Sequence, residues 1–244
     1  MAILEVNNLT KLYKNGRGVR NVSFKVEQGD IVGLLGPNGS GKTTIMKVIM
    51  GLIHANEGSV QIFGQDVEKD VEKALADVGG LIERPAIYEY LTARENLEMA
   101  ARLYAGKVTG DRIDKVLKIV RMTQFQKEKC SRFSLGMKQR LGLALAILSE
   151  PKLVVLDEPT IGLDIEGTVE IREIILAMAK EKGTSFLIAS HLAPELEKQC
   201  NKVAIIHEGA LLSFDTLEES LKFNPTLEDY FLARVKEVRG SVLV

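Results

Sequence analysis

The sequence predicts an α/β protein with a mainly parallel central sheet, an N-terminal antiparallel β subdomain and an inserted all-helical subdomain. Three observations lead to this prediction. The first segment alternates loosely between apolar and polar residues, four later runs are apolar without alternation, and the middle of the chain has no strand-like run. Alternation is typical of strands with one solvated face, whereas unbroken apolar runs are typical of strands that are buried on both faces.

The N-terminal segment extends from Ala2 to about Gln28. It contains ILEVNNLTKLY and VSFKVEQGD, which are separated by the turn-forming pair Asn15 and Gly16. This pattern predicts short antiparallel strands joined by a turn.

The buried strands of the central sheet are predicted from four short runs rich in β-branched residues. They are IVGLL at 31–35, KLVVL at 152–156, SFLIAS at 185–190 and KVAII at 202–206. Helical stretches separate them, as expected for parallel strands joined by crossover connections.

The helical subdomain is expected at about 84–149. Thr92 and Glu95 have the spacing of a capping box ahead of ENLEMAARLYAG. Further on, an apolar stripe with helical spacing comprises Ile113, Val116, Leu117 and Val120. We therefore expect one domain over 1–216 that carries this insertion, followed by a short helical tail over 217–244, to which the sequence assigns no chemistry.

Composition limits the classes of partner and compartment. The formal net charge of −1 and the pI near 6.4 do not predict a nucleic-acid-binding surface, so no nucleic acid partner is expected. No apolar run of 18 residues or secretory signal pattern is found in the sequence, and we expect a cytoplasmic protein. Cys130 and Cys200 have no CxxC partner and are expected to be reduced thiols.

A phosphate-binding loop is the strongest motif. The segment GPNGSGKTT fits GxxxxGK[ST], follows the predicted strand IVGLL and precedes a helical pattern. Its glycines let backbone N–H groups point at phosphates, Lys42 neutralises the β and γ oxygens, and Thr43 offers a hydroxyl to Mg²⁺. An ordinary glycine turn is the alternative. The predicted ATP-binding residues of the loop are Gly36, Pro37, Asn38, Gly39, Ser40, Gly41, Lys42, Thr43 and Thr44.

An acidic pair supplies the second element that a phosphate-binding loop needs. LVVLDEP places Asp157 and Glu158 at the end of a predicted strand, at the sheet edge where α/β proteins bind ligands. Asp157 is expected to hold Mg²⁺ through a water, and Glu158 to orient the attacking water. In isolation such a pair is usually a solvated strand end.

The segment FSLGMKQR, Phe133 to Arg140, opens a predicted helix with Ser134 at its N-cap, where free N–H groups form an anion site. Together with the preceding motifs, this order of residues resembles the nucleotide-binding subunits of ABC transporters from Leu9 to about Phe214. The resemblance implies that Ser134 and Gly136 contact the γ-phosphate of an ATP held by a second subunit. The family's usual form is LSGGQ, from which Leu135 and Met137 depart.

The resemblance extends to four further residues. It implies that Asp164 reaches across a dimer, that His191 contacts the γ-phosphate, and that Tyr13 stacks on adenine. Glu83 stands where the family usually has a glutamine that links the nucleotide site to the helical subdomain, and a carboxylate there is expected to make nucleotide sensing depend more steeply on Mg²⁺. A structural hydrogen bond for His191, an edge-strand position for Tyr13 and a solvated loop acid at Glu83 are the alternatives.

The motifs LIERP, SLGMKQRLG and LEDYF resemble the branch that contains bacitracin-resistance and lantibiotic-immunity ATPases. This resemblance implies an exporter that works with polytopic membrane subunits, at the cytoplasmic face of the membrane, as a homodimer or with a paralogous ATPase. The expected docking surface is Pro85, Ile87, Tyr88 and Tyr90, unless these side chains pack inside the helical subdomain. A soluble ABC-type ATPase and a P-loop kinase are the rival hypotheses.

Overall fold

The computed structural model describes residues 2–104 and 108–240. The chain forms two compact units. The first, here called the terminal unit, comprises Met1–Ala76 and Ser185–Val244, and the second, the middle unit, comprises Asp77–Thr184.

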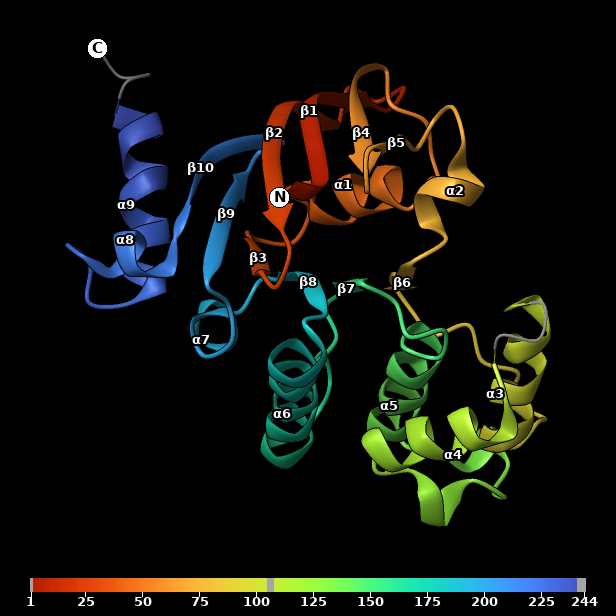
Figure 1. The fold of residues 1–244 in the computed structure, drawn as a ribbon. Helices are drawn as coiled ribbons and strands as arrows, with labels where there is room; N and C mark the ends of the chain where they lie inside the picture. Colours follow the sequence, from red (N-terminus) through yellow and green to blue (C-terminus); the bar gives the residue numbers. More distant parts are fainter. Residues whose placement is uncertain (1, 105–107, 241–244) are drawn as a thin grey trace. The chain divides into compact units, whose positions relative to one another are not determined.

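An antiparallel sheet begins the terminal unit. β1 (Ala2–Leu12) pairs with β2 (Gly18–Glu27) on one side and with β4 (Glu57–Ile62) on the other, and β5 (Gln65–Asp66) follows β4. Buried residues alternate with exposed ones from Val22 to Val26 of β2 and only loosely along β1, and the pairing of the two strands confirms the predicted antiparallel pair. Two short helices also belong to this unit, α1 (Lys42–Ile49) and α2 (Val71–Leu75), and Figure 1 shows α1 close to β1, β2 and β4.

A second group of strands in the terminal unit is mainly parallel. β3 (Ile31–Leu35) lies between β8 (Ser185–Ser190) and β9 (Lys202–His207) and is parallel to both. Every residue of β3 and β8 is buried. The prediction of parallel strands covered on both faces is therefore confirmed. β10 (Ala210–Thr216), which the sequence did not predict, runs antiparallel to β9.

A network of polar side chains fixes the start of β3. Asp30 accepts hydrogen bonds from Asn201 Nδ2 and Lys202 Nζ, each at 2.8 Å, and Asn201 Oδ1 accepts from the Ile31 N–H at 2.7 Å. Lys202 Nζ also reaches Glu27 at 2.8 Å. Burial lowers the pKa of Lys202, but its hydrogen bonds with Asp30 and Glu27 outweigh this effect, and the net pKa is raised. The β3–β9 pair is thus held by charges as well as by backbone bonds.

The helix α9 (Leu227–Gly240) packs against two shorter helices of this unit, α7 (Ala193–Glu197) and α8 (Leu217–Leu221). The Glu197 carboxylate accepts the Leu227 N–H at 2.7 Å, at the start of α9. The Tyr230 hydroxyl is hydrogen-bonded to Ser213 at 2.9 Å and to Asp215. Figure 1 shows α9 beside α8 and β10. The tail is therefore part of the terminal unit's packing.

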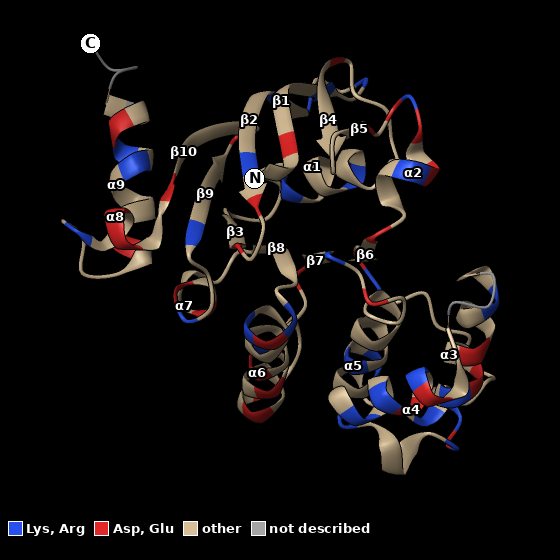
Figure 2. Ribbon diagram, in the orientation of Figure 1, with Lys and Arg blue, Asp and Glu red and all other residues tan. Residues whose placement is uncertain are grey.

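The middle unit combines two parallel strands with helices. β6 (Val78–Leu81) pairs with β7 (Leu153–Asp157). Its helices are α3 (Ala93–Ala101), η1 (Arg102–Tyr104), α4 (Gly110–Ile119), η2 (Thr123–Phe125), η3 (Cys130–Arg132), α5 (Leu135–Ala146) and α6 (Ile165–Lys182). Thr92 and Glu95 form the predicted capping box, and the predicted apolar stripe on α4 is at most 3% exposed. The ribbon in Figure 2 is coloured for both basic and acidic residues along α3 and α4.

A buried guanidinium joins two of these helices. Arg112 on α4 donates from Nε to the Leu148 carbonyl at 3.0 Å and from Nη2 to the Ile147 carbonyl at 2.5 Å. Nη1 of the same guanidinium forms an ion pair with Glu150 Oε1 at 3.0 Å. Arg112 thus caps the C-terminal end of α5. Across residues 2–104 and 108–240, no helix combines the length and the apolar character needed to cross a bilayer.

Candidate functional site

The phosphate-binding loop occupies residues 36–41, between the end of β3 and the start of α1, as the sequence predicts. Gly36 is required by space, because a Cβ there would lie 2.1 Å from the Ile206 carbonyl oxygen of β9. Gly39 and Gly41 are required by conformation, with φ of 81° and 110°. The loop therefore turns tightly against β9, and α1 begins directly after it at Lys42.

Lys42 is held inside this loop. Its side chain is buried, and Nζ donates to the carbonyl oxygens of Gly36 at 2.7 Å and Pro37 at 3.2 Å. The hydroxyl oxygen of Ser40, also buried, has no hydrogen-bond partner among the described residues. Thr43 and Thr44 belong to the first turn of α1, where N–H groups and the helix dipole favour anions. This combination of a fixed ammonium, an unsatisfied hydroxyl and a helix N-terminus fits a phosphate chain.

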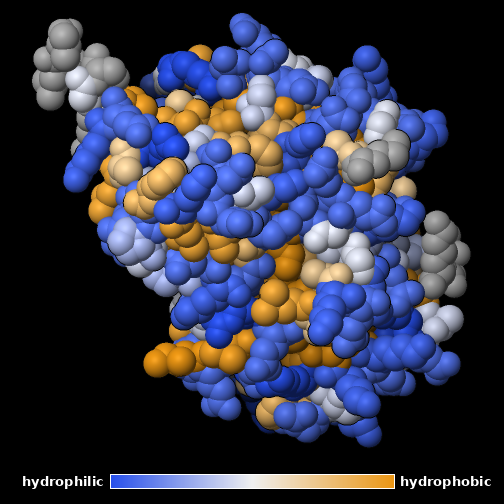
Figure 3. Space-filling view, turned by 60° about the vertical axis from the view of Figure 1, so that its left-hand side comes forward, coloured by the Kyte–Doolittle hydropathy of each residue, from blue (hydrophilic) through white to orange (hydrophobic). Residues whose placement is uncertain are grey.

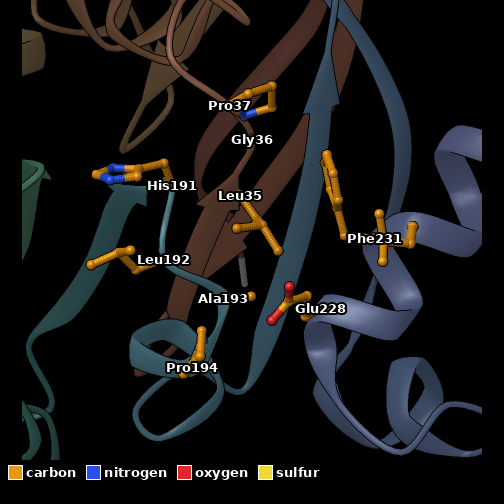
Figure 4. A pocket seen from close by; sticks show the side chains of 10 residues that line it. Leu35, Gly36, Pro37, His191, Leu192, Ala193, Pro194, Glu228 and Phe231 are labelled. Carbon is orange, nitrogen blue, oxygen red and sulfur yellow. The ribbon is translucent and has the colours of Figure 1, made fainter.

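His191 follows β8 directly, in the same unit as the loop. It lines a pocket of about 400 Å³ whose other walls are the end of β3, the start of α7 and the first turns of α9. Figure 4 shows Glu228 and Phe231 projecting from α9 toward Leu35, while the His191 imidazole points away from α9. The sequence assigned no chemistry to α9. The sequence analysis did not predict that α9 lines this pocket together with Gly36 and Pro37 of the loop, because tertiary packing and not a sequence motif brings α9 there.

Tyr13 lies directly after β1 and is 42% exposed. Its backbone N–H donates to the Arg17 carbonyl at 2.8 Å, and Lys11 Nζ lies 5.8 Å from the centre of its ring. The pairing of β1 with β4 reaches Thr10, whereas its pairing with β2 reaches Leu12, so the alternative of an aromatic at a strand edge stays open. A ring held on a turn and open to solvent is suited to stacking on a base.

The acidic pair belongs to the middle unit. β7 ends at Asp157, whose side chain is buried, and Glu158 follows with φ of 48°. Positive φ is uncommon for a residue with a Cβ and is found at functional sites that the surrounding structure enforces. The Glu158 carbonyl accepts the Ile161 N–H at 3.1 Å, which closes the turn after the strand.

Ser134 and Asp164 both cap helices of the middle unit. Ser134 is the N-cap of α5, where its Oγ accepts the Met137 N–H at 3.3 Å. Asp164 is the N-cap of α6, where its Oδ1 accepts the Gly167 N–H at 2.8 Å. The N-cap position of Ser134 was predicted. That of Asp164 was not, although an Asp directly before a helical pattern could have indicated it.

The segment from Glu83 to Tyr90 lies on the surface of the middle unit. Glu83 is exposed and has φ of 62°. Tyr88 and Tyr90 are 49% and 67% exposed, with ring centroids 5.9 Å apart in an edge-to-face arrangement. Packing of these two rings inside the helical subdomain is therefore ruled out. Figure 3 shows apolar side chains gathered in several small groups among hydrophilic ones on the face that it presents.

Each unit thus carries part of the predicted site. The terminal unit holds Tyr13, the phosphate-binding loop and His191. The middle unit holds Glu83, Ser134, Gly136, Asp157, Glu158 and Asp164. Hydroxyl and carboxylate oxygens, as on Thr43, Asp157 and Glu83, are the donors that Mg²⁺ prefers.

The chain is similar in sequence and fold to known proteins. A family model described as ABC transporter matches residues 19–161, which is more than half of the chain. The bacitracin transport ATP-binding protein BcrA of Bacillus licheniformis is 43% identical over 220 residues, covering 89% of this chain and 72% of BcrA. The lantibiotic transport ATP-binding protein SrtF of Streptococcus pyogenes is 35% identical over 229 residues, covering 94% and 96%. A solved ATP-binding subunit of an ABC transporter has a TM-score of 0.85 and 29% identity, covering 96% of this chain and all of that one.

The fold, the phosphate-binding loop and the family match define a P-loop ATPase. The chain belongs to the ABC transporter family and is an ATP-binding subunit of the kind that hydrolyses ATP.

Proposed function

We propose that this chain powers an exporter of antimicrobial-peptide-like or other amphipathic cargo. The relatives named for bacitracin and lantibiotic transport support the cargo class. The ATPase activity is supported mainly by the loop at 36–41. Lys42 and Ser40 present polar groups suited to phosphate there, and position 36 has no room for a side chain beyond that of glycine.

In the proposed mechanism, the loop N–H groups and Lys42 bind and orient the phosphates, and Tyr13 stacks on the adenine. Thr43 and Asp157 would hold Mg²⁺, with Glu83 as a further oxygen donor, and the metal would neutralise charge on the β- and γ-phosphates. Glu158 accepts a proton from the attacking water and orients it, while His191 stabilises the γ-phosphate oxygens as charge develops there.

We further propose that two copies close head to tail, with Ser134 and Gly136 of each copy contacting the ATP bound by the other. Three exposed aliphatic side chains support a contact face beside these residues: Leu135, Ile161 and Ile165 are 52%, 47% and 88% exposed. Exposed apolar groups around a polar site are typical of protein–protein contacts. A dimer with a paralogous ATPase would use the same face.

A polytopic membrane subunit is the second proposed partner, and it would hold the chain at the cytoplasmic face of the membrane. The surface formed by Pro85, Ile87, Tyr88 and Tyr90 is its proposed docking site. The exposure of both tyrosine rings supports this proposal, since aromatic side chains are enriched at interface hot spots.

The test uses Glu158→Gln, which keeps the size of the side chain but removes the base. Wild-type protein with Mg²⁺ and ATP should release free phosphate. The variant should release little and should accumulate as an ATP-bound dimer in size-exclusion chromatography, while Lys42→Ala should neither dimerise nor hydrolyse. A monomeric Glu158→Gln variant at saturating ATP, or transfer of the phosphoryl group to an acceptor in place of phosphate release, would contradict the mechanism.

A further inference from the structure

We infer that Leu135 is a positioning residue, which holds the loop 161–164 against the first turn of α5. In this arrangement Ser134 at the start of α5 and Asp164 at the end of the loop keep a fixed position relative to each other when they contact a second copy. The inference rests on the proposed dimer. It concerns a residue that departs from the family's usual signature sequence, which has glycine at this position.

The first observation is a close fit between Leu135 and Gly162. A Cβ built on Gly162 would lie 2.3 Å from Leu135 Cδ2 and 3.6 Å from its Cγ. Gly162 also has φ of 72°, a conformation that residues with a Cβ rarely adopt. The leucine side chain therefore lies directly over the glycine, in space that any side chain at position 162 would need.

A second contact lies one residue further along both segments. A Cβ on Gly136 would lie 3.2 Å from Leu163 Cδ2, so this leucine of the loop covers the glycine of α5. Leu135 covers Gly162 and Leu163 covers Gly136. Two reciprocal leucine–glycine contacts fix both the distance and the register of the loop relative to the helix, because a shift of either segment would bring a leucine onto a neighbouring backbone.

The same two segments are also joined beyond the loop. Arg140 on α5 forms an ion pair with Glu170 on α6, and Glu170 further accepts a hydrogen bond from Arg121 at 2.8 Å. The loop is closed by a hydrogen bond from the Leu163 N–H to the carbonyl of Thr160, the residue directly before the loop, at 3.2 Å. The helices α5 and α6 are thus joined by the Arg140–Glu170 ion pair and by the leucine–glycine contacts. Of these, the contact made by Leu135 lies nearest in sequence to Ser134.

Core packing does not explain Leu135, because half of its side chain is exposed. Nor does the helix need it, since the Ser134 cap of α5 is made by the hydroxyl and the Met137 N–H. Removing the leucine side chain should therefore loosen the loop and leave α5 intact. This distinction separates a positioning role from a purely structural one.

The experiment compares Leu135→Ala with Leu176→Ala, which shortens an exposed leucine on α6 of the same unit. Both changes are made in Glu158→Gln protein. Leu135→Ala should raise the ATP concentration for half-maximal dimerisation about five- to tenfold, the scale of one lost apolar contact, and should speed amide hydrogen exchange in residues 160–164. Affinity of the monomer for ADP and the thermal midpoint should stay unchanged, Leu135→Met should restore both altered readouts, and Leu176→Ala should alter neither.

Gly162→Ala tests the contact from the other side. Its backbone strain persists in any background, but the displacement of Leu135 does not, so it should weaken dimerisation less in Leu135→Ala protein than in protein with Leu135. Unchanged exchange in residues 160–164 of Leu135→Ala would overturn the inference even if dimerisation weakens, because Leu135 would then only contact the second copy directly. Additive effects of Leu135→Ala and Gly162→Ala would overturn it as well. If the parent Glu158→Gln protein itself fails to dimerise, the proposed function fails, whereas the exchange measurement still decides whether Leu135 holds the loop.

Discussion

The most sharply defined perturbation in the phosphate-binding loop is Gly36→Ala. The added Cβ would lie 2.1 Å from the Ile206 carbonyl oxygen and 2.7 Å from Ser40 Oγ, whereas ordinary contact begins at 3.4 Å. Because the carbonyl belongs to β9 and cannot rotate away, the start of the loop must move by about 1 Å. Overpacking of this kind costs about 1–3 kcal/mol of stability. A displacement of about 1 Å at a catalytic site lowers turnover by about 100-fold.

Gly39→Ala is the matched control, because it adds the same methyl group to the same loop. Gly39 has φ of 81° and no atom within 4 Å of its Cβ position. Only backbone strain of about 1–2 kcal/mol is added, so turnover should fall much less than in Gly36→Ala. Phosphate release and binding of a fluorescent ATP analogue measure both variants. Equal losses in the two variants, or wild-type nucleotide affinity in Gly36→Ala, would refute the role of the close approach to β9.

Three further predictions concern charge, metal and thiols. Lys202→Met should lower the free energy of unfolding by about 2 kcal/mol. Lys202, and to a smaller extent Lys25, lowers the pKa of Glu27 from 4.5 in the folded protein. The resulting stability is therefore present above pH 4.5 and is lost as the pH falls below 4.5 through the lowered folded-state pKa, and denaturant titrations should show this loss reduced in the variant. Glu83→Gln should make hydrolysis less steeply dependent on Mg²⁺, and an unchanged Mg²⁺ titration would exclude the proposed sensing role. Burial raises the pKa of Cys130 to about 11 and that of Cys200 further, so neither thiol should react with a maleimide at pH 7.5 until the protein unfolds; labelling of native protein would contradict this burial.

The buried strands β3, β7, β8 and β9 and the local motifs were predictable because they depend on neighbours in sequence. The unbroken apolar run at 31–35 required burial on both faces, and β3 is buried throughout. The capping box at Thr92 and the N-cap at Ser134 are also local, and both were predicted from residue type and spacing.

Features that depend on contacts distant in sequence were not predictable. The carbonyl of Ile206 makes Gly36 obligatory, and the two positions are 170 residues apart. Similarly, no motif indicated that α9 would line the pocket beside the phosphate-binding loop. The sequence predicted which residues are candidates for the chemistry, while the packing that holds them in place is seen only in the structure.

Affinity purification of this chain from detergent-solubilised membranes tests most directly whether it is the ATPase of a membrane transporter. A polytopic membrane protein should be recovered with the wild-type chain and with Lys42→Ala, and it should be lost when Tyr88 and Tyr90 are changed to Asp. Recovery of soluble proteins alone, with the chain absent from the membrane fraction, would contradict the claim and favour a soluble ATPase of the same family.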